Sequence, residues 1–124
     1  MGYRSDVRIA TTCEGYDRMC GFVDAASEGR GTYPLMGSAR QPEFYDEHDG
    51  CAVFGWDSIK WYEGCLPDVT AVCDALNDLN KAGVPYEFCR VGESYDDIEY
   101  ISRNDNEKLS MHVYPDVTVE IAVG

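Results

Sequence analysis

The sequence predicts an α+β fold in which two helices cover one face of a mostly antiparallel sheet. Two segments place apolar residues on one side only at helical spacing, so each helix needs a sheet to cover. The other ordered segments are short, rich in β-branched and aromatic residues, and bounded by turn residues. The 124 residues have the length of one domain and no linker divides them, so we expect a single acidic domain over 1–124.

The chain is expected to begin with a strand and a helix. Residues 3–11 predict the strand because Val7 and Ile9 alternate with polar residues. Thr12 is a suitable N-cap for the helix, and Gly29 can end it in a left-handed conformation. Apolar side chains recur along this helix at i, i+3, i+4, i+7 and i+10, a stripe that we interpret as core packing. The stripe consists of Tyr16, Met19, Cys20, Val23 and Ala26.

A loop over 30–42 and a hairpin are expected next. The Asp49-Gly50 pair favours a hairpin turn because it lies between two β-prone runs, 43–47 and 52–61. We interpret the aromatic residues that end the hairpin as structural, with a ligand-binding shelf as the alternative. These aromatic residues are Trp56, Trp61 and Tyr62.

The second half of the chain predicts another helix and three strands. Pro67 suits the first turn of the helix, and Gly83 can end it. Strands are expected over 85–91 and 98–103, and the last strand is expected over 111–123 as an extended segment that Pro115 interrupts. This order of elements is compatible with a ferredoxin-like variant. The apolar stripe of the second helix consists of Val69, Val72, Cys73, Leu76 and Leu79.

The net charge of −13 is unevenly distributed along the chain. Residues 1–40 contain five acidic and five basic residues, so the whole excess of acid lies in residues 41–124. A protein that binds DNA or RNA directly needs cations to replace condensed counterions, so we exclude nucleic acid as a direct ligand. A basic protein surface is the complementary partner, and solubility alone is the other explanation of the acidity.

Two acidic segments with interleaved aromatic residues are the candidate partner-binding surface. Carboxylates and aromatic rings together can bind a basic surface through charged hydrogen bonds and cation–π contacts. The other readings are charge protection of an edge strand, a solvated turn, or carboxylate ligands for Mg²⁺ or Ca²⁺. The first segment contributes Glu43, Phe44, Tyr45, Asp46, Glu47 and Asp49. The second contributes Glu93, Tyr95, Asp96, Asp97 and Glu99.

Nothing in the sequence predicts a catalytic centre, a metal site or a cofactor. There is no phosphate-binding or dinucleotide-binding glycine motif, and the spacing of the acids matches no EF-hand loop. A dyad of His48 and Cys51 is conceivable, but nearness in sequence does not establish catalytic geometry. Without a signal peptide or a membrane segment, we expect a cytoplasmic protein whose six cysteines are free thiols.

Three short segments resemble small bacteriophage and prophage proteins that have no established activity. They are the opening Met1 to Val7, the stretch from Ile59 to Tyr62 with Pro67 to Val69 after it, and the segment from Tyr86 to Glu99. The resemblance implies a compact cytoplasmic α+β protein of phage type in the host bacterial cytosol, and it assigns no catalytic residue. By analogy of size and charge, such a protein is similar to anti-CRISPR and anti-restriction inhibitors that imitate DNA.

The leading hypothesis is therefore a non-enzymatic inhibitor from a mobile element. Its acidic segments would occupy a basic nucleic-acid groove of a host protein or nucleoprotein complex, with a CRISPR–Cas effector favoured. One alternative is a phage housekeeping or scaffold module whose acidity serves solubility only. The other is a small carboxylate-metal hydrolase. The sequence does not choose between a monomer and an oligomer.

Overall fold

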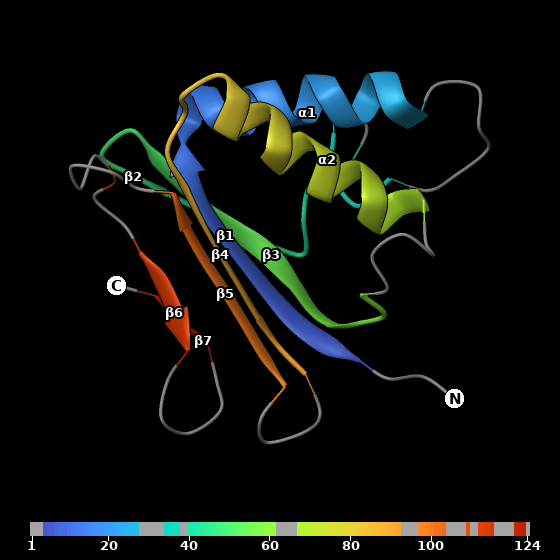
Figure 1. Ribbon diagram of the computed structural model, residues 1–124, viewed down its shortest axis with the longest axis vertical. Helices are drawn as coiled ribbons and strands as arrows, with labels where there is room; N and C mark the ends of the chain where they lie inside the picture. Colours follow the sequence, from blue (N-terminus) through green and yellow to red (C-terminus); the bar gives the residue numbers. More distant parts are fainter. Residues whose placement is uncertain are drawn as a thin grey trace.

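The computed structural model describes residues 4–27, 34–37, 40–61, 67–92, 97–103, 109, 112–115 and 121–123. Strands and helices follow one another in the predicted order (Figure 1). The elements are β1 (Ser5–Thr12), α1 (Cys13–Ser27), β2 (Phe44–His48), β3 (Cys51–Ile59), α2 (Pro67–Lys81), β4 (Tyr86–Val91), β5 (Ile98–Arg103), β6 (Val113–Pro115) and β7 (Ile121–Val123).

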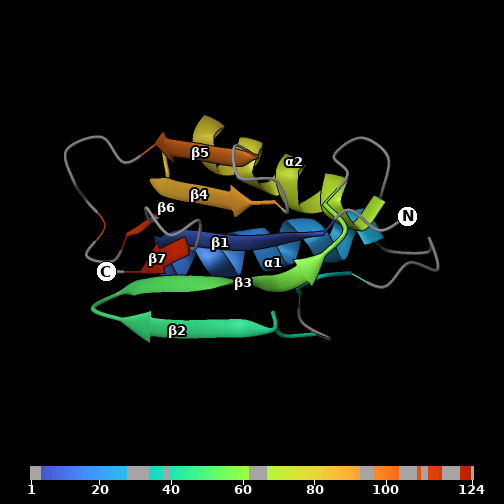
Figure 2. The same ribbon diagram turned by 90° about the horizontal axis from the view of Figure 1, so that it is seen from below.

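Five strands form one antiparallel sheet in the order β2-β3-β1-β4-β5, and the two helices lie together on one face of it (Figures 1 and 2). The predicted α+β class is confirmed. From β1 to β4 the elements follow the β-α-β-β-α-β order of ferredoxin-like folds, and β5 extends the sheet at one edge. Figure 2 shows α2 behind the β4 and β5 side of the sheet.

Local sequence signals account for the start of α1 and for the hairpin turn. The hydroxyl of Thr12 accepts a hydrogen bond from the amide of Gly15 at 2.9 Å, which confirms Thr12 as the N-cap. Asp49 and Gly50 have φ angles of 54° and 76°, the left-handed pair that a two-residue hairpin turn between β2 and β3 requires. The expected end of α1 at Gly29 lies outside the described residues.

The main core lies between the helices and the sheet. Both predicted helical stripes face it, and Leu79 and Val72 are fully buried. Trp56 and Trp61 are 2% and 7% exposed, so the structural interpretation of these two rings is confirmed. At Gly55 on β3 an added Cβ would collide with the carbonyl of Val7, so only glycine allows β1 and β3 to approach this closely.

The expectation of one strand over 111–123 is wrong. This segment contains β6 and β7, which pair with each other and pack beneath the face of the sheet opposite the helices (Figure 1). A second apolar cluster explains this arrangement, because Cys89 and Val91 on β4 contact Leu109 and Val113 there. The segment thereby removes apolar residues of that face from water, which favours this arrangement.

Candidate functional site

The two acidic segments lie at opposite edges of the sheet. The first is β2 with its turn, and the described part of the second is the start of β5. Three strands separate β2 from β5, a distance of about 19 Å at the usual strand spacing. The sequence-based hypothesis treated both segments as one partner surface, and the sheet order does not bring them together. Glu93, Tyr95 and Asp96 lie outside the described residues.

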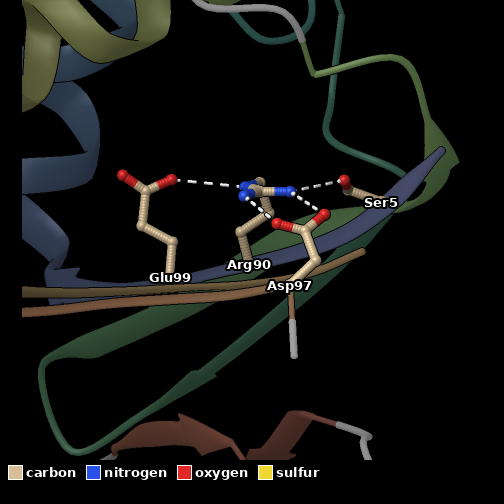
Figure 3. Close-up of polar contacts among 4 residues, drawn as sticks. All are labelled: Ser5, Arg90, Asp97 and Glu99. Carbon is tan, nitrogen blue, oxygen red and sulfur yellow. Dashed lines mark hydrogen bonds and ion pairs between the residues drawn. The ribbon is translucent and has the colours of Figure 1, made fainter. Parts of the chain in front are cut away.

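At the β5 edge the described acids are bound by an arginine of the same chain (Figure 3). Arg90 on β4 donates hydrogen bonds to both carboxylate oxygens of Asp97, at 2.8 and 3.1 Å, and to Glu99 at 3.2 Å. Ser5 accepts a further bond from Arg90 at 3.0 Å. The carboxylate of Asp97 is the main reason that the pKa of Arg90 is raised. The geometry gives these two acids a structural role, and the single positive charge of Arg90 offsets one of their two negative charges.

The acids of the β2 edge are exposed and are not paired with a lysine or an arginine in the described part of the chain. The side chains of Asp46, Glu47 and Asp49 are exposed, and within the part of the chain that the structure describes they form no ion pair with lysine or arginine. Glu43 is also exposed, and its carboxylate accepts the backbone N–H of Asp57 at 3.2 Å. This edge therefore carries uncompensated negative charge.

The two aromatic residues of β2 point to opposite faces of the sheet, and each of them contacts another residue of the same chain. Tyr45 packs on Tyr16 of α1 with ring centroids 4.9 Å apart. Burial raises its pKa to about 12, and its hydroxyl donates to Glu47 at 3.1 Å. Phe44 lies on the other face beneath the guanidinium of Arg8, 4.6 Å from its ring centroid. Both rings support the strand, so the exposed acids are the groups of this edge that remain for a partner. Two of them also accept hydrogen bonds within the chain, Glu47 from Tyr45 and the Cys13 thiol and Asp46 from the amide of Glu47.

Sequence reasoning missed one acid of this edge because it lies in the charge-balanced first third of the chain. Asp17 on α1 is exposed, and its charge contributes to the raised pKa of Tyr45 on β2. Its neighbouring arginines are paired elsewhere, Arg8 with Asp57 at 2.8 Å and Arg18 with Asp78 at 2.7 Å. The only sequence signal was its helical spacing from the apolar stripe. We call Asp17, Asp46, Glu47 and Asp49 the β2 acidic surface. It extends over both sides of the sheet edge, because Glu47 shares a face with Tyr45 and α1 whereas Asp46 shares the opposite face with Phe44.

A second missed group is a buried carboxylate on the far face of the sheet. Glu87 on β4 is 3% exposed and accepts a hydrogen bond from the amide of Val113 at 3.1 Å. Its other oxygen contacts Nδ1 of His112 at 2.8 Å. These contacts attach β6 to the sheet. A glutamate in an alternating strand gives no sign of such a role until its partner strand is placed.

The described cysteines and histidines do not form a reactive centre. Cys51 is 3% exposed in the second apolar cluster, whereas His48 is exposed in the hairpin. Burial raises the pKa of Cys89 to about 11 and that of Cys13 above its usual value, so both thiols stay protonated near neutral pH. No group of three or more metal-ligating side chains occurs among the residues described.

The free cysteines of the described segments are Cys13, Cys20, Cys51, Cys73 and Cys89. In those same segments, no helix combines the length and the apolar character that crossing a bilayer requires. Comparison with protein-family models, with curated proteins and with solved structures finds no match. A functional proposal therefore depends on the charge and geometry of the two sheet edges.

Proposed function

We propose that this protein binds the basic nucleic-acid-binding surface of another protein through its β2 acidic surface and so excludes nucleic acid from that surface. The observation that carries the proposal is the uncompensated charge of an exposed edge strand. Arg8, Arg18 and Arg90 are paired with other acids, and none of them neutralises this edge. A basic groove is its electrostatic complement.

β2 exposes its acids along an open sheet edge that is held rigidly. Successive side chains of a strand point to opposite faces, so Asp46 and Glu47 carry negative charge on both sides of this edge, Glu47 on the side of Tyr45 and Asp46 on the side of Phe44. The edge is also held rigidly, because β2 pairs with β3 over its whole length and Tyr45 packs on α1. A rigid charged surface loses little conformational entropy when it binds.

The biological setting that we propose is an inhibitor made by a mobile element and acting in the host cytosol, as in anti-CRISPR proteins. The resemblance to phage proteins supports this setting, and a CRISPR–Cas effector is the first target to assay. The role is a binding role and not an enzymatic one.

The test compares two exposed aspartates, one on the proposed binding edge and one on a helix away from it. Asp46→Lys reverses one charge on the β2 acidic surface, and Asp74→Lys makes the same change on α2. With a basic target such as a Cas effector, we expect Asp46→Lys to weaken binding at least about tenfold, because a like charge then faces the groove. Asp74→Lys should bind as the unchanged protein does.

Competition and salt give a second readout of the same experiment. Duplex DNA and this protein should exclude one another from the target, and affinity should fall as salt rises from about 50 to about 200 mM. If DNA and the protein bind together, or if both aspartate variants bind equally well, the proposal fails. The acidity of β2 then serves solubility and protection of the strand edge.

A further inference from the structure

The other sheet edge has a different surface chemistry. β5 is the outermost strand on the side opposite β2, and in the described part of the chain no strand pairs with its outer side (Figure 2). Large hydrophobic side chains are exposed at Ile98 and Tyr100, which are 40% and 46% exposed. Both residues belong to this one strand. An open edge strand with exposed apolar side chains is a template for pairing with another strand.

Charge separates the two edges further. β2 carries Asp46 and Glu47, so two copies of this edge would place acid against acid. β5 carries one acid and one base, Glu99 and Arg103, separated by four positions on the same face of the strand. A strand of this kind can be complementary to a second copy of itself.

We propose that a second copy of this chain pairs with β5 in antiparallel orientation about a twofold axis at Ile101. The sheets of the two copies then become one continuous sheet, with Ile101 opposite the partner's Ile101. Each Glu99 lies opposite the partner's Arg103, and symmetry forms this ion pair twice. The proposal concerns the edge opposite the β2 acidic surface, so it stands apart from the proposed function.

The register follows from symmetry and charge. A twofold axis perpendicular to the sheet leaves the same face of both copies on the same side. Residues that lie opposite each other must therefore come from the same face of β5. An axis at Tyr100 would place Glu99 opposite the partner's Ile101, so no opposite charge would face Glu99 across the strand pair. An axis at Ile101 places Glu99 opposite the partner's Arg103. Opposite charges directly across a strand pair are favourable, and only this register forms them.

The side chains needed for this pairing are available. Arg103 is exposed and, within the described residues, has no acidic partner. Glu99 contacts Arg90 through Oε1 alone, which leaves its other oxygen for a second cation. On the opposite face, Tyr100 becomes the diagonal neighbour of the partner's Tyr100, roughly 7–8 Å away, and aromatic rings reach each other over that distance. Pairing therefore covers exposed apolar surface as well.

The two β2 edges remain free in such a dimer. They lie at the two ends of the joined sheet, roughly 40 Å apart if nine strand spacings separate them. Their like charges are then far beyond the Debye length of about 8 Å at physiological salt. The net charge of −13 on each copy thus need not prevent association through β5.

Sedimentation velocity of the isolated protein at about 0.15 M salt tests the proposal. We expect a species of twice the 13.9 kDa chain mass. Arg103→Glu should weaken the dimer about tenfold, because it places two like-charged pairs across the axis. Arg40→Glu is the matched control, since it reverses another exposed arginine, which precedes β2 at the far edge of the sheet. Circular dichroism should show that both variants are folded.

A mixture of two variants tests the register itself. Arg103→Glu and Glu99→Lys each place like charges across their own homodimer axis, whereas a heterodimer of the two restores both opposite-charge pairs. We expect each variant alone to be largely monomeric and the mixture to dimerise. A monomer of the unchanged protein at about 0.1 mM overturns the proposal, because a dissociation constant below about 10 µM would give mostly dimer there. Dimers that Arg103→Glu leaves intact, or a mixture that stays monomeric, overturn the register.

Discussion

Replacing Arg90 by methionine tests whether the acids at the start of β5 serve the fold. The guanidinium of Arg90 joins three parts of the chain, since it bonds Asp97 and Glu99 beside β4 and Ser5 on β1 (Figure 3). Methionine keeps much of the apolar stem and removes the charge and all of these hydrogen bonds. The change therefore isolates the polar contribution of the cluster.

The expected loss of stability depends on how deeply Arg90 and its acidic partners are buried. The side chains of Arg90 and Asp97 are 16% and 26% exposed, so their two-bond contact lies between a surface pair and a buried one, at about 1.5 kcal/mol. Glu99 is 40% exposed and makes one longer bond, so solvent screening limits it to about 0.5 kcal/mol. We expect Arg90→Met to lower the free energy of unfolding by about 2 kcal/mol in total.

Urea unfolding measures this loss, and an unchanged m value would show that both states keep their compactness. A double-mutant cycle with Asp97→Asn should give a coupling of about 1.5 kcal/mol, and a cycle with Glu99→Gln should give about 0.5 kcal/mol or less. A loss below about 0.5 kcal/mol for Arg90→Met would refute the structural role of this cluster. A larger coupling to Glu99 than to Asp97 would refute the use of burial to rank the two pairs.

Three further predictions concern the core, the far face of the sheet and the β2 edge. Leu79→Ala should lower the free energy of unfolding by about 2–5 kcal/mol because Leu79 is fully buried, whereas the exposed neighbour Asn80→Ala should stay within about 0.5 kcal/mol. Glu87→Gln should speed hydrogen exchange at the amide of Val113, and unchanged exchange would mean that this contact does not hold β6. Burial raises the pKa of Tyr45 from 10.0 to about 12, so the unfolded chain releases that proton first and stability should fall between those pH values. Tyr45→Phe should flatten that fall in pH-dependent unfolding, and equal slopes would contradict the assignment.

The elements that the sequence predicted well are those set by neighbouring residues. The strand over 98–103 has the predicted bounds, and the turn at Asp49 and Gly50 joins β2 to β3 as expected. Thr12 caps α1 through a bond three residues away. Turn geometry, caps and helical periodicity depend on a few adjacent side chains, so they can be recognised without knowledge of the sheet.

The candidate site could be predicted only in part. The acids of β2 were identified from composition and spacing, and their exposure supports that choice. The acids Asp97 and Glu99 gave the same signal, yet both are held by Arg90 on the adjacent strand, which offsets one of their two charges. Asp17 gave no signal in the charge distribution, because arginines balance the acids of its part of the sequence, and two of those arginines are paired with other acids in space. The net charge of a segment therefore does not show which of its acids are exposed and unpaired on the folded surface.

By itself the sequence determined the α+β class, the order of the helices and strands, and the acidic character of the molecule. The tertiary structure decided which strands are edges, which acids are paired with an arginine, and where the last segment packs. The β6–β7 pair covers the second apolar cluster because Leu109 and Val113 can bury Cys89 and Val91 there. Such outcomes depend on contacts between residues far apart in the chain, which burial and strand pairing select together and no local pattern encodes.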